Sequence, residues 1–314
     1  MRNGVEPARN LLIVHEPMGQ ALSDWLSVKE RIDRKAPDIE VRIATNRAPN
    51  SATRRWQGSR PSLVFSPHVL MVYRPNGGKV YAGQDFSKLE QIKLLSRQGL
   101  SVPVTATLTR DLVIDPAQWG RYVIAKPIDG GKGQGVYLVQ TTDLAARYCE
   151  LTLNDTRTMV VQPYIEHSEN GCPTSYRVLT LFGRVLYSAR NTWAVARPPL
   201  EEIAANPNGI IASNDGSFGR LRTVWNDPEI IALGEQAASA FPECPVLGVD
   251  LVRDLETNKL YILEVNPTGR VWHFSSPLAV NRFTAEYRTN LYAQFGALDR
   301  TAELLIEKTR KEAI

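Results

Sequence analysis

The segment that most restricts this chain is residues 246–270, which read VLGVDLVRDLETNKLYILEVNPTGR. Two apolar runs flank a short polar turn that contains Asp and Asn, both good turn formers, so the segment predicts a β-hairpin. If the hairpin folds about Thr257, Asp250 lies directly opposite Glu264 on the neighbouring strand. Asn266 lies two residues beyond Glu264 and therefore points to the same face of the sheet.

This arrangement places two carboxylates and one side-chain amide on a single face. Such a set suits a hard divalent cation such as Mg²⁺, which takes oxygen ligands and keeps positions for water and substrate phosphates. The alternative is an ordinary hairpin whose outward face is acidic. The segment alone favours neither interpretation, and a second motif changes the balance.

The second motif is residues 122–140, YVIAKPIDGGKGQGVYLVQ, in which a glycine-dense loop separates two β-rich runs. The loop contains Gly130, Gly131, Lys132, Gly133 and Gly135. Glycines let backbone N–H groups approach phosphate oxygens, and lysines, including Lys126 before the loop, supply compensating charge. The spacing is neither GxxxxGK[ST] nor a GxGxxG that opens a helix. We therefore predict a phosphate-binding flap between antiparallel strands, with a plain flexible hairpin as the alternative.

Together with three further segments, the hairpin and the glycine loop resemble the ATP-grasp superfamily. Residues 87–105 resemble its lysine-headed helix, which begins at Lys88 and runs into a Gly-x-x-x-Pro-x-Thr turn. Residues 160–165, VVQPYI, resemble the linker that passes the adenine edge, and Arg177 stands where the family has a phosphate-contacting arginine. The motifs are nearest to those of the ribosomal-protein glutamate ligase and glutathione synthetase-like carboxylate–amine ligases.

The resemblance implies an α/β (α+β) chain with the three-part ATP-grasp fold. The expected parts are a small N-terminal parallel α/β domain at residues 1–85, a lid subdomain with the glycine flap at 86–165, and a C-terminal subdomain with the metal site at 166–314. The last two are α+β subdomains that clasp ATP. The residues of the first part agree, because an apolar run at 11–14, a helical face and an alternating run at 39–43 give a β-α-β order.

The resemblance also implies the ligands of the site. ATP and Mg²⁺ are the expected cofactors, with Mn²⁺ as an alternative metal and two ions in the site. The expected metal ligands are Asp250, Glu264 and Asn266. The expected nucleotide contacts are Lys88, Lys126, the flap residues Gly130, Gly131, Lys132, Gly133 and Gly135, the linker residues Gln162, Pro163, Tyr164 and Ile165, and Glu169. An acidic ribose contact usually follows the linker, and Glu166 and Glu169 are both candidates for it.

Three arginines are predicted to act on the reacting groups. Arg177 would contact the phosphates. Arg190 follows a predicted hairpin and would grip a substrate carboxylate in a bidentate pair, with a solvated surface arginine as the alternative. Arg270 adjoins Asn266, and either Arg270 or His273 is expected to contact the acceptor or the acyl phosphate. Arg220 and Arg222 lie in a stretch, residues 198–227, that is predicted to be irregular. Surface exposure is their favoured interpretation, and a loop that covers the substrate is the alternative.

The activity implied by the resemblance is that of an ADP-forming carboxylate–amine ligase for amino acids or peptides. ATP would phosphorylate a carboxylate, and an amine would then displace phosphate from the acyl phosphate. An ATP-grasp kinase that phosphorylates a hydroxyl needs the same phosphate machinery, so the motifs do not separate it from a ligase. A non-catalytic ATP-binding regulator is a third interpretation, which the intact metal carboxylates disfavour. Residues 267–277 depart from the usual pattern, so the substrate pair stays open.

Composition agrees with a globular enzyme that works in the cytoplasm. The chain has 314 residues, of which 43% are hydrophobic and 22% charged, so it can bury substantial cores. Its net charge of +4 is small and does not indicate a nucleic-acid partner. The three cysteines share no ligand spacing, and no apolar run approaches the ~20 residues needed to cross a bilayer, so no zinc site, disulfide framework or membrane partner is expected. A homodimer is left open.

Overall fold

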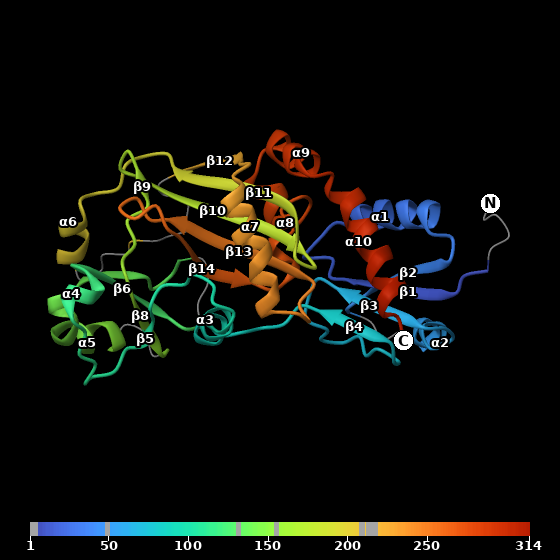
Figure 1. The fold of residues 1–314 in the computed structure, drawn as a ribbon, viewed down its shortest axis with the longest axis horizontal. Helices are drawn as coiled ribbons and strands as arrows, with labels where there is room; N and C mark the ends of the chain where they lie inside the picture. Colours follow the sequence, from blue (N-terminus) through green and yellow to red (C-terminus); the bar gives the residue numbers. More distant parts are fainter. Residues whose placement is uncertain (1–5, 48–50, 130–132, 154–156, 207–210, 212–218) are drawn as a thin grey trace.

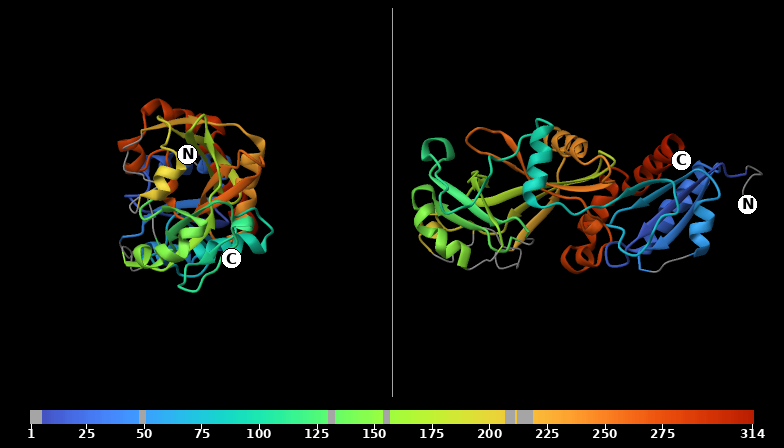
Figure 2. Two further views of the ribbon diagram at one scale, coloured as in Figure 1. Left: turned by 90° about the vertical axis from the view of Figure 1, so that its left-hand side faces the viewer. Right: turned by 90° about the horizontal axis from the view of Figure 1, so that it is seen from below.

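The computed structural model describes residues 6–47, 51–129, 133–153, 157–206, 211 and 219–314. These residues form an elongated molecule in which three β-sheets follow one another along the long axis (Figure 1). The N-terminal sheet lies at one end, a small antiparallel sheet at the other, and the largest sheet between them, as the side views also show (Figure 2). The predicted mixture of a parallel α/β sheet with two α+β units is confirmed.

The first sheet has the strand order β2-β1-β3-β4, and all neighbouring strands are parallel. Its elements are β1 (Arg9–His15), α1 (Leu22–Lys35), β2 (Ile39–Thr45), α2 (Ser51–Gln57), β3 (Ser62–Ser66) and β4 (Lys79–Ala82). The predicted β-α-β order is therefore correct. Helix α1 packs onto the sheet through buried Trp25, Val28 and Ile32, which recur at helical spacing.

A small antiparallel sheet, the lid sheet, has the strand order β5-β8-β6-β7. The elements of this region are α3 (Lys88–Arg97), β5 (Ala106–Thr107), α4 (Pro116–Trp119), β6 (Tyr122–Pro127), β7 (Tyr137–Gln140), η1 (Thr141–Asp143), α5 (Leu144–Leu153) and β8 (Met159–Pro163). Strands β6 and β7 pair antiparallel on either side of the glycine loop, as predicted.

The large sheet has the strand order β12-β11-β10-β13-β14, and the short strand β9 pairs with β10. Its region contains β9 (Ser168–Glu169), β10 (Cys172–Leu181), β11 (Arg184–Trp193), α6 (Leu200–Ala205), β12 (Arg220–Val224), α7 (Pro228–Gln236), η2 (Ala237–Ala240), β13 (Val246–Arg253), β14 (Leu260–Asn266), η3 (Gly269–Val271), α8 (Pro277–Arg282), α9 (Ala285–Gln294) and α10 (Ala297–Glu312). Helix α6 and strand β12 correct the prediction that residues 198–227 are irregular.

The hairpin of β13 and β14 has the register expected from the sequence, with Asp250 opposite Glu264. Asn258 adopts a φ of 56° in the turn, a left-handed conformation that Asn tolerates better than most residues. A bulge follows Asp250, so that Leu251 faces Ile262. The extra residue of the bulge, Leu263, lets Asp250 pair with Glu264 although the pairs nearer the turn are shifted by one residue.

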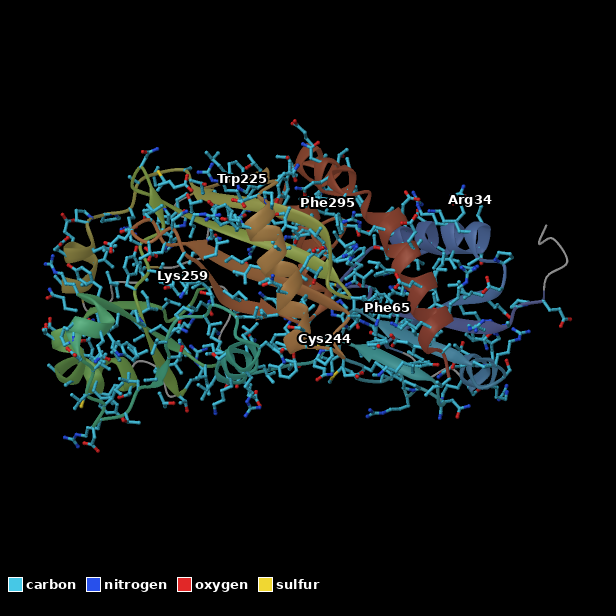
Figure 3. The ribbon with its side chains drawn as sticks, in the orientation of Figure 1. Arg34, Phe65, Trp225, Cys244, Lys259 and Phe295 are labelled. Carbon is cyan, nitrogen blue, oxygen red and sulfur yellow. The ribbon has the colours of Figure 1, made fainter. Side chains whose placement is uncertain are left out.

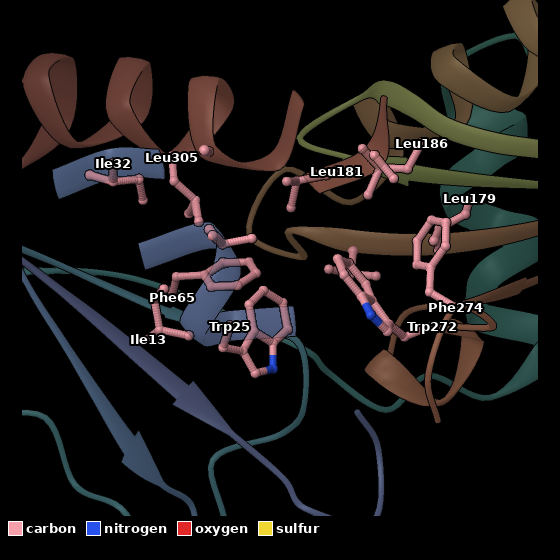
Figure 4. Packing of buried hydrophobic residues seen from close by; sticks show 14 of the residues in the cluster. Ile13, Trp25, Ile32, Phe65, Leu179, Leu181, Leu186, Trp272, Phe274 and Leu305 are labelled. Carbon is pink, nitrogen blue, oxygen red and sulfur yellow. The ribbon is translucent and has the colours of Figure 1, made fainter. Parts of the chain in front are cut away.

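The last helix, α10, returns the end of the chain to the first sheet, where it packs against α1, β1 and β3. Leu305 on α10 is fully buried, in the same apolar cluster as Ile13 and Phe65 of that sheet. Figure 4 shows this cluster continuing through Trp25 to Trp272, whose rings lie 4.9 Å apart between centroids. The first sheet and the large sheet therefore share one core.

The loop after β14 is fixed to the first sheet by a buried carboxylate, that of Asp24 on α1. The indole N–H of Trp272 and the hydroxyl of Tyr292 each donate a hydrogen bond of 2.7 Å to Asp24, and Ser275 donates a third. Three donors satisfy most of the lone pairs of a carboxylate that is 5% exposed. Among the described residues, no helix is both long and apolar enough to span a membrane.

Replacing Leu305 with Ala tests whether α10 is part of the shared core. The change leaves a cavity between α10 and the first sheet, so the free energy of unfolding should fall by about 2–4 kcal/mol. Urea denaturation of the full chain measures the change. Glu307→Ala, on the exposed side of the same helix, is the matched control and should change the stability by less than about 0.5 kcal/mol. Equal stabilities of the two variants would contradict the shared core.

Candidate active site

A cavity of about 400 Å³ lies between the lid sheet and the large sheet. Helix α3 and strands β6 and β8 contribute to it on one side, and β10 to β14 contribute on the other, together with α8 and α9. On the large sheet many lining residues are alternate residues of a strand, which point to the same face. Examples are Arg177 on β10, Asn191 on β11 and Arg222 on β12. One face of that sheet is therefore the floor of the cavity.

Three charged residues form a row across neighbouring strands of this floor. Asp250 on β13 pairs with Glu264 on β14 and, on its other side, with Arg177 on β10. The guanidinium of Arg177 donates to both carboxylate oxygens of Asp250, through Nε at 2.7 Å and through Nη2. Burial opposes the charge on Arg177, but Asp250 outweighs it and raises the pKa of Arg177. The pair therefore holds Asp250 in one orientation.

The predicted metal ligands lie together at this row. The side-chain amide of Asn266 donates to Oδ2 of Asp250 at 3.1 Å, and Glu264 is the cross-strand neighbour of Asp250. Burial raises the pKa of Glu264, the charge of Asp250 adds to this, and Lys88 opposes it. Crowded hard oxygen donors of this kind fit a divalent cation, which would relieve the repulsion between the two carboxylates.

Lys88 reaches the row from the first turn of α3. The helix begins with a capping box in which the Ser87 hydroxyl accepts from the backbone N–H of Glu90 at 3.3 Å, and the Glu90 carboxylate accepts from the backbone N–H of Ser87 at 2.8 Å. This cap fixes the start of the helix, and Nζ of Lys88 then lies 3.8 Å from Oε1 of Glu264.

Lys126 enters the cavity from β6 and is 8% exposed. Burial lowers its pKa to about 8, the charge of Glu264 opposes this shift, and Lys88 adds to it. Two lysines and two carboxylates thus lie close together in the lining of the cavity. An added anion would stabilise both lysines in their charged form.

The four predicted linker residues all line the cavity: Gln162, Pro163, Tyr164 and Ile165. Gln162 on β8 is buried and donates through Nε2 to Oγ1 of Thr105 at 2.8 Å, so its side chain is fixed. The backbone N–H of Tyr164 donates to Tyr122 at 3.0 Å, which ties the linker to the lid sheet. The end of β8 and the two residues after it therefore form a wall with polar and apolar groups, of the kind that suits a heterocyclic base.

The glycine loop is described only in part. Gly133 lines the cavity, and both Gly133 and Gly135 have positive φ, of 72° and 69°, which glycine adopts without steric cost. Gly130, Gly131 and Lys132 lie outside the described residues. The prediction that the loop binds phosphate stays a prediction for all five residues.

The structure corrects the interpretation of Arg190. Arg190 is one residue beyond Ala189, which lines the cavity, and so it lies on the opposite face of the sheet. There it pairs with Glu169 and its guanidinium lies 4.9 Å from the ring centroid of Trp225. Neither Arg190 nor Glu169 is among the residues that line the cavity. A one-residue shift along β11 therefore takes Arg190 out of the cavity, and Glu169, on β9, lies outside it as well.

Arg270 is also placed differently from the prediction. It lies on η3, is exposed, and is not among the lining residues. His273, in contrast, lines the cavity, and its Nδ1 shares a hydrogen bond of 3.0 Å with the hydroxyl of Tyr187. Burial holds the pKa of His273 well below its usual value, so the ring is neutral. Of the two ribose candidates, Glu166 pairs with Arg197, which lines the cavity.

Sequence reasoning did not single out four residues of the floor and far wall: Tyr187, Asn191, Arg282 and Tyr287. It weighed Arg220 and Arg222 only as members of an irregular loop, whereas both lie on β12 and line the cavity. The signal for a strand was present in the run RLRTV at 220–224, where alternating arginines fall on one face if the run is a strand. Because β12 is a short edge strand, its pattern is too brief to identify without its partner β11.

Comparisons with known proteins agree with this geometry. The ATP-grasp domain family matches residues 86–270. A probable alpha-L-glutamate ligase of Methanococcoides burtonii is 28% identical over 206 residues, which are 65% of this chain and 62% of that protein. Another, of Aeromonas salmonicida, is 30% identical over 182 residues, which are 57% of this chain and 55% of that protein. The chain spans less than two thirds of the length of these curated relatives.

Solved structures share the fold. The ATP-grasp ligase PsnB, complexed with a minimal precursor, has a TM-score of 0.55 at 16% identity, and the match covers 97% of this chain and 100% of that one. The D-cycloserine synthetase DcsG has a TM-score of 0.51 at 15% identity, with 94% of this chain and 99% of that one covered. At these identities the likeness is one of fold.

Replacing Arg177 with Met tests the charged row. Removal of the cation leaves Asp250 beside Glu264 without its charged hydrogen-bond donor, so the free energy of unfolding at pH 7 should fall by about 1–3 kcal/mol. Thermal or urea unfolding measures the loss. The matched control is Arg34→Met, an exposed arginine on α1, which should leave stability nearly unchanged. If the two variants are equally stable, Arg177 does not organise the row.

Proposed function

The chain belongs to the ATP-grasp family, and we propose that it is an ADP-forming ligase that joins a carboxylate to an amine. The observation that supports this most directly is the row of Glu264, Asp250 and Arg177, which lines the same cavity as Lys88 and Lys126. The names of the relatives support an amino acid, with L-glutamate as the first candidate, as one of the substrates.

The lysines would bind the triphosphate of ATP. Lys88 and Lys126 both line the cavity, and their charges would neutralise the negative charge that spreads over the phosphoryl oxygens during transfer. The base would lie along the wall formed by residues 162–165, with Gly133 on the phosphate side. This assigns the lid sheet to the nucleotide and leaves the floor of the large sheet to the second substrate.

Asp250, Glu264 and Asn266 would hold Mg²⁺. When bound, the ion neutralises phosphate charge and orients the phosphates for transfer. Arg177 would keep the Asp250 carboxylate in the orientation seen here, through its two hydrogen bonds. Asn266 would do the same from the other side through its amide, which donates to Oδ2 of Asp250.

A ligase of this kind needs no nucleophilic side chain. An oxygen of the substrate carboxylate attacks the γ-phosphorus of ATP, the bond to the bridging oxygen breaks, and ADP leaves. The amine of the second substrate then attacks the carbonyl carbon of the acyl phosphate, and inorganic phosphate leaves with the electron pair of the C–O bond. The two sheets enclose the cavity and limit the access of water, which would otherwise hydrolyse the acyl phosphate.

The proposal predicts that Glu264→Gln keeps the fold but loses turnover. We expect the release of ADP and phosphate to fall by about 10²-fold or more, because a ligand to the charge-neutralising ion is lost. The assay supplies Mg-ATP, a panel of amino acids including L-glutamate, and hydroxylamine as a generic amine. Hydroxamate should form in step with ADP and phosphate in the wild-type chain.

The control for this assay is Glu256→Gln, an exposed carboxylate in the turn of the same hairpin, which should retain wild-type turnover. Full turnover by Glu264→Gln would falsify the proposed metal site. ADP formed together with a phosphorylated product, but without phosphate or hydroxamate, would instead identify a kinase.

Lys126 gives a pH-dependent prediction. Its pKa of about 8 means that it is charged below that pH and neutral above it, and a bound phosphate favours the charged form. In EDTA, the affinity for a fluorescent ATP analogue should therefore fall by about threefold to tenfold between pH 7.5 and pH 9. Lys126→Met should bind more weakly with little slope, while Lys93→Met, an exposed lysine on α3, should keep the wild-type slope. A wild-type affinity that is constant across this range would contradict the assignment.

A further inference from the structure

The burial of its two neighbours in the chain holds His273 in the lining of the cavity. Trp272 and Phe274 are fully buried in the core shared by the first sheet and the large sheet, and Trp272 also donates to Asp24 (Figure 4). The backbone on both sides of His273 is therefore fixed, while the imidazole lines the cavity. The ring of Phe283 packs edge-on against the imidazole, with 4.9 Å between the centroids. The position of the imidazole is thus set by packing before any ligand binds.

The hydroxyl of Tyr187 determines which nitrogen of His273 carries the proton. The hydroxyl oxygen lies 2.9 Å from the carbonyl oxygen of Val271 and 3.0 Å from Nδ1 of His273. A carbonyl oxygen only accepts, so the single hydroxyl proton is donated to Val271, and Nδ1 must donate to the hydroxyl oxygen. Burial raises the pKa of Tyr187 well above its ordinary value, so the hydroxyl keeps its proton. His273 is therefore the Nδ1–H tautomer, and its Nε2 has an unshared electron pair.

The Nε2 atom of His273 is open to a ligand. No described residue hydrogen-bonds to it, and the atom retains accessible surface on a side chain that lines the cavity. Burial lowers the pKa of His273 well below its ordinary value, and the charges of Arg177 and Arg222 lower it further, so the ring is neutral at pH 7. A neutral imidazole with an open electron pair is a proton acceptor.

The other proton acceptors among the described lining residues serve different purposes. The carboxylates of Asp250 and Glu264 form the proposed metal site. His167 lies beside the linker, where its Nδ1 is bonded to a backbone oxygen of that segment. His273, in contrast, is close enough to Arg177 for the charge of that guanidinium to lower its pKa, and Arg177 belongs to the row at which phosphate would be transferred. Nε2 of His273 is therefore the neutral acceptor beside the reacting groups.

The amine substrate must lose a proton when it forms the amide, and we propose that Nε2 of His273 accepts it. The inference rests on the proposed ligase function and adds a general base to it. An amine that arrives as an ammonium ion first gives one proton to solvent. As the amine nitrogen attacks the carbonyl carbon of the acyl phosphate, a second N–H proton passes to Nε2. The C–O bond to phosphate breaks, phosphate keeps the electron pair, and Nε2 returns the proton to a phosphate oxygen. HPO₄²⁻ leaves, and His273 is neutral again.

The bound intermediate and Tyr187 both adapt His273 to this role. The negative charge of the acyl phosphate favours the protonated imidazole, so it raises the affinity of Nε2 for a proton only when the intermediate is present. Tyr187 is a positioning residue, because its hydroxyl oxygen accepts the Nδ1–H of both the neutral and the protonated ring. Without that acceptor, the proton of the neutral ring is no longer confined to Nδ1.

The first test determines the tautomer of His273 in the full chain without any substrate. Nitrogen-15 NMR of the ring nitrogens separates the two neutral tautomers from each other and from the imidazolium. The chain has four histidines, and the signals of His273 are those that are absent from the spectrum of His273→Asn. At pH 7 the wild-type chain should show the neutral Nδ1–H form, and Tyr187→Phe should show a mixture of the two neutral forms. A wild-type ring that is protonated, or that carries its proton on Nε2, would overturn the proposal.

The second test compares two nucleophiles in the assay of the proposed function. Hydroxylamine is neutral at pH 7 and reacts with acyl phosphates without a catalyst, whereas the amine of an amino acid needs a base. Each amino acid of the panel supplies both a carboxylate and an amine, and mass spectrometry measures amide and hydroxamate. In His273→Asn, amide formation should slow by about 10²-fold while hydroxamate formation stays within about threefold of the wild-type rate. Asn suits this test because its side-chain amide can still donate to Tyr187.

Two further variants keep the test sharp. Tyr187→Phe keeps the ring, so it reports on the base even if His273→Asn folds poorly, and its ratio of amide to hydroxamate should fall by about tenfold. Arg34→Gln, on the exposed side of α1, is the control for a substitution outside the cavity and should keep the wild-type ratio (Figure 3). The proposal is overturned if His273→Asn forms amide at the wild-type rate. It is also overturned if both products fall by the same factor in both variants, because His273 would then only support the shape of the cavity.

The outcomes separate this inference from the proposed function. Amide and hydroxamate from the wild-type chain, with an unchanged ratio in His273→Asn and Tyr187→Phe, would support the ligase and overturn the base. Neither product from any amino acid of the panel would overturn the ligase and with it the catalytic role of His273, whatever tautomer the NMR spectrum shows.

Discussion

The cross-strand row of Glu264, Asp250 and Arg177 is the interaction on which the rest of the site depends. The three side chains stand side by side only because β13 lies between β14 and β10 in one antiparallel register. A shift of one residue would turn each of them to the opposite face of the sheet. Val249 and Leu251, the neighbours of Asp250 along β13, are buried in the apolar core. Their burial fixes the strand and therefore the position of the carboxylate.

Charge balance decides what this row can bind. Each carboxylate in it has a cationic neighbour, Arg177 for Asp250 and Lys88 for Glu264, and Lys126 adds a positive charge that burial disfavours. A cation bound by the carboxylates and an anion bound by the lysines would each reduce the free energy cost of holding these charges out of water. The site is thus built to take oppositely charged ligands together, as a metal–nucleotide complex provides.

The first sheet contributes to the site through packing. The loop after Asn266 inserts Trp272 between the first sheet and the large sheet, where Asp24 accepts its indole N–H. The same loop carries His273 into the cavity. The apolar core that joins the two sheets therefore also fixes one wall of the cavity, although none of the described lining residues belongs to the first sheet.

The sequence alone determined the hairpin register and the antiparallel strands around the glycine loop, because both depend on local alternation and turn chemistry. The linker residues 162–165 followed only from the resemblance to ATP-grasp proteins. The sequence did not determine which face of β11 Arg190 occupies. Side chains alternate between the two faces of a strand, so an error of one residue in the expected register places Arg190 in the cavity instead of its neighbours Ala189 and Asn191. The sequence also did not place Arg222 on a strand, because β12 becomes a strand only through its pairing with β11. Those choices belong to the tertiary structure, since edge pairing and burial act between segments far apart in the chain.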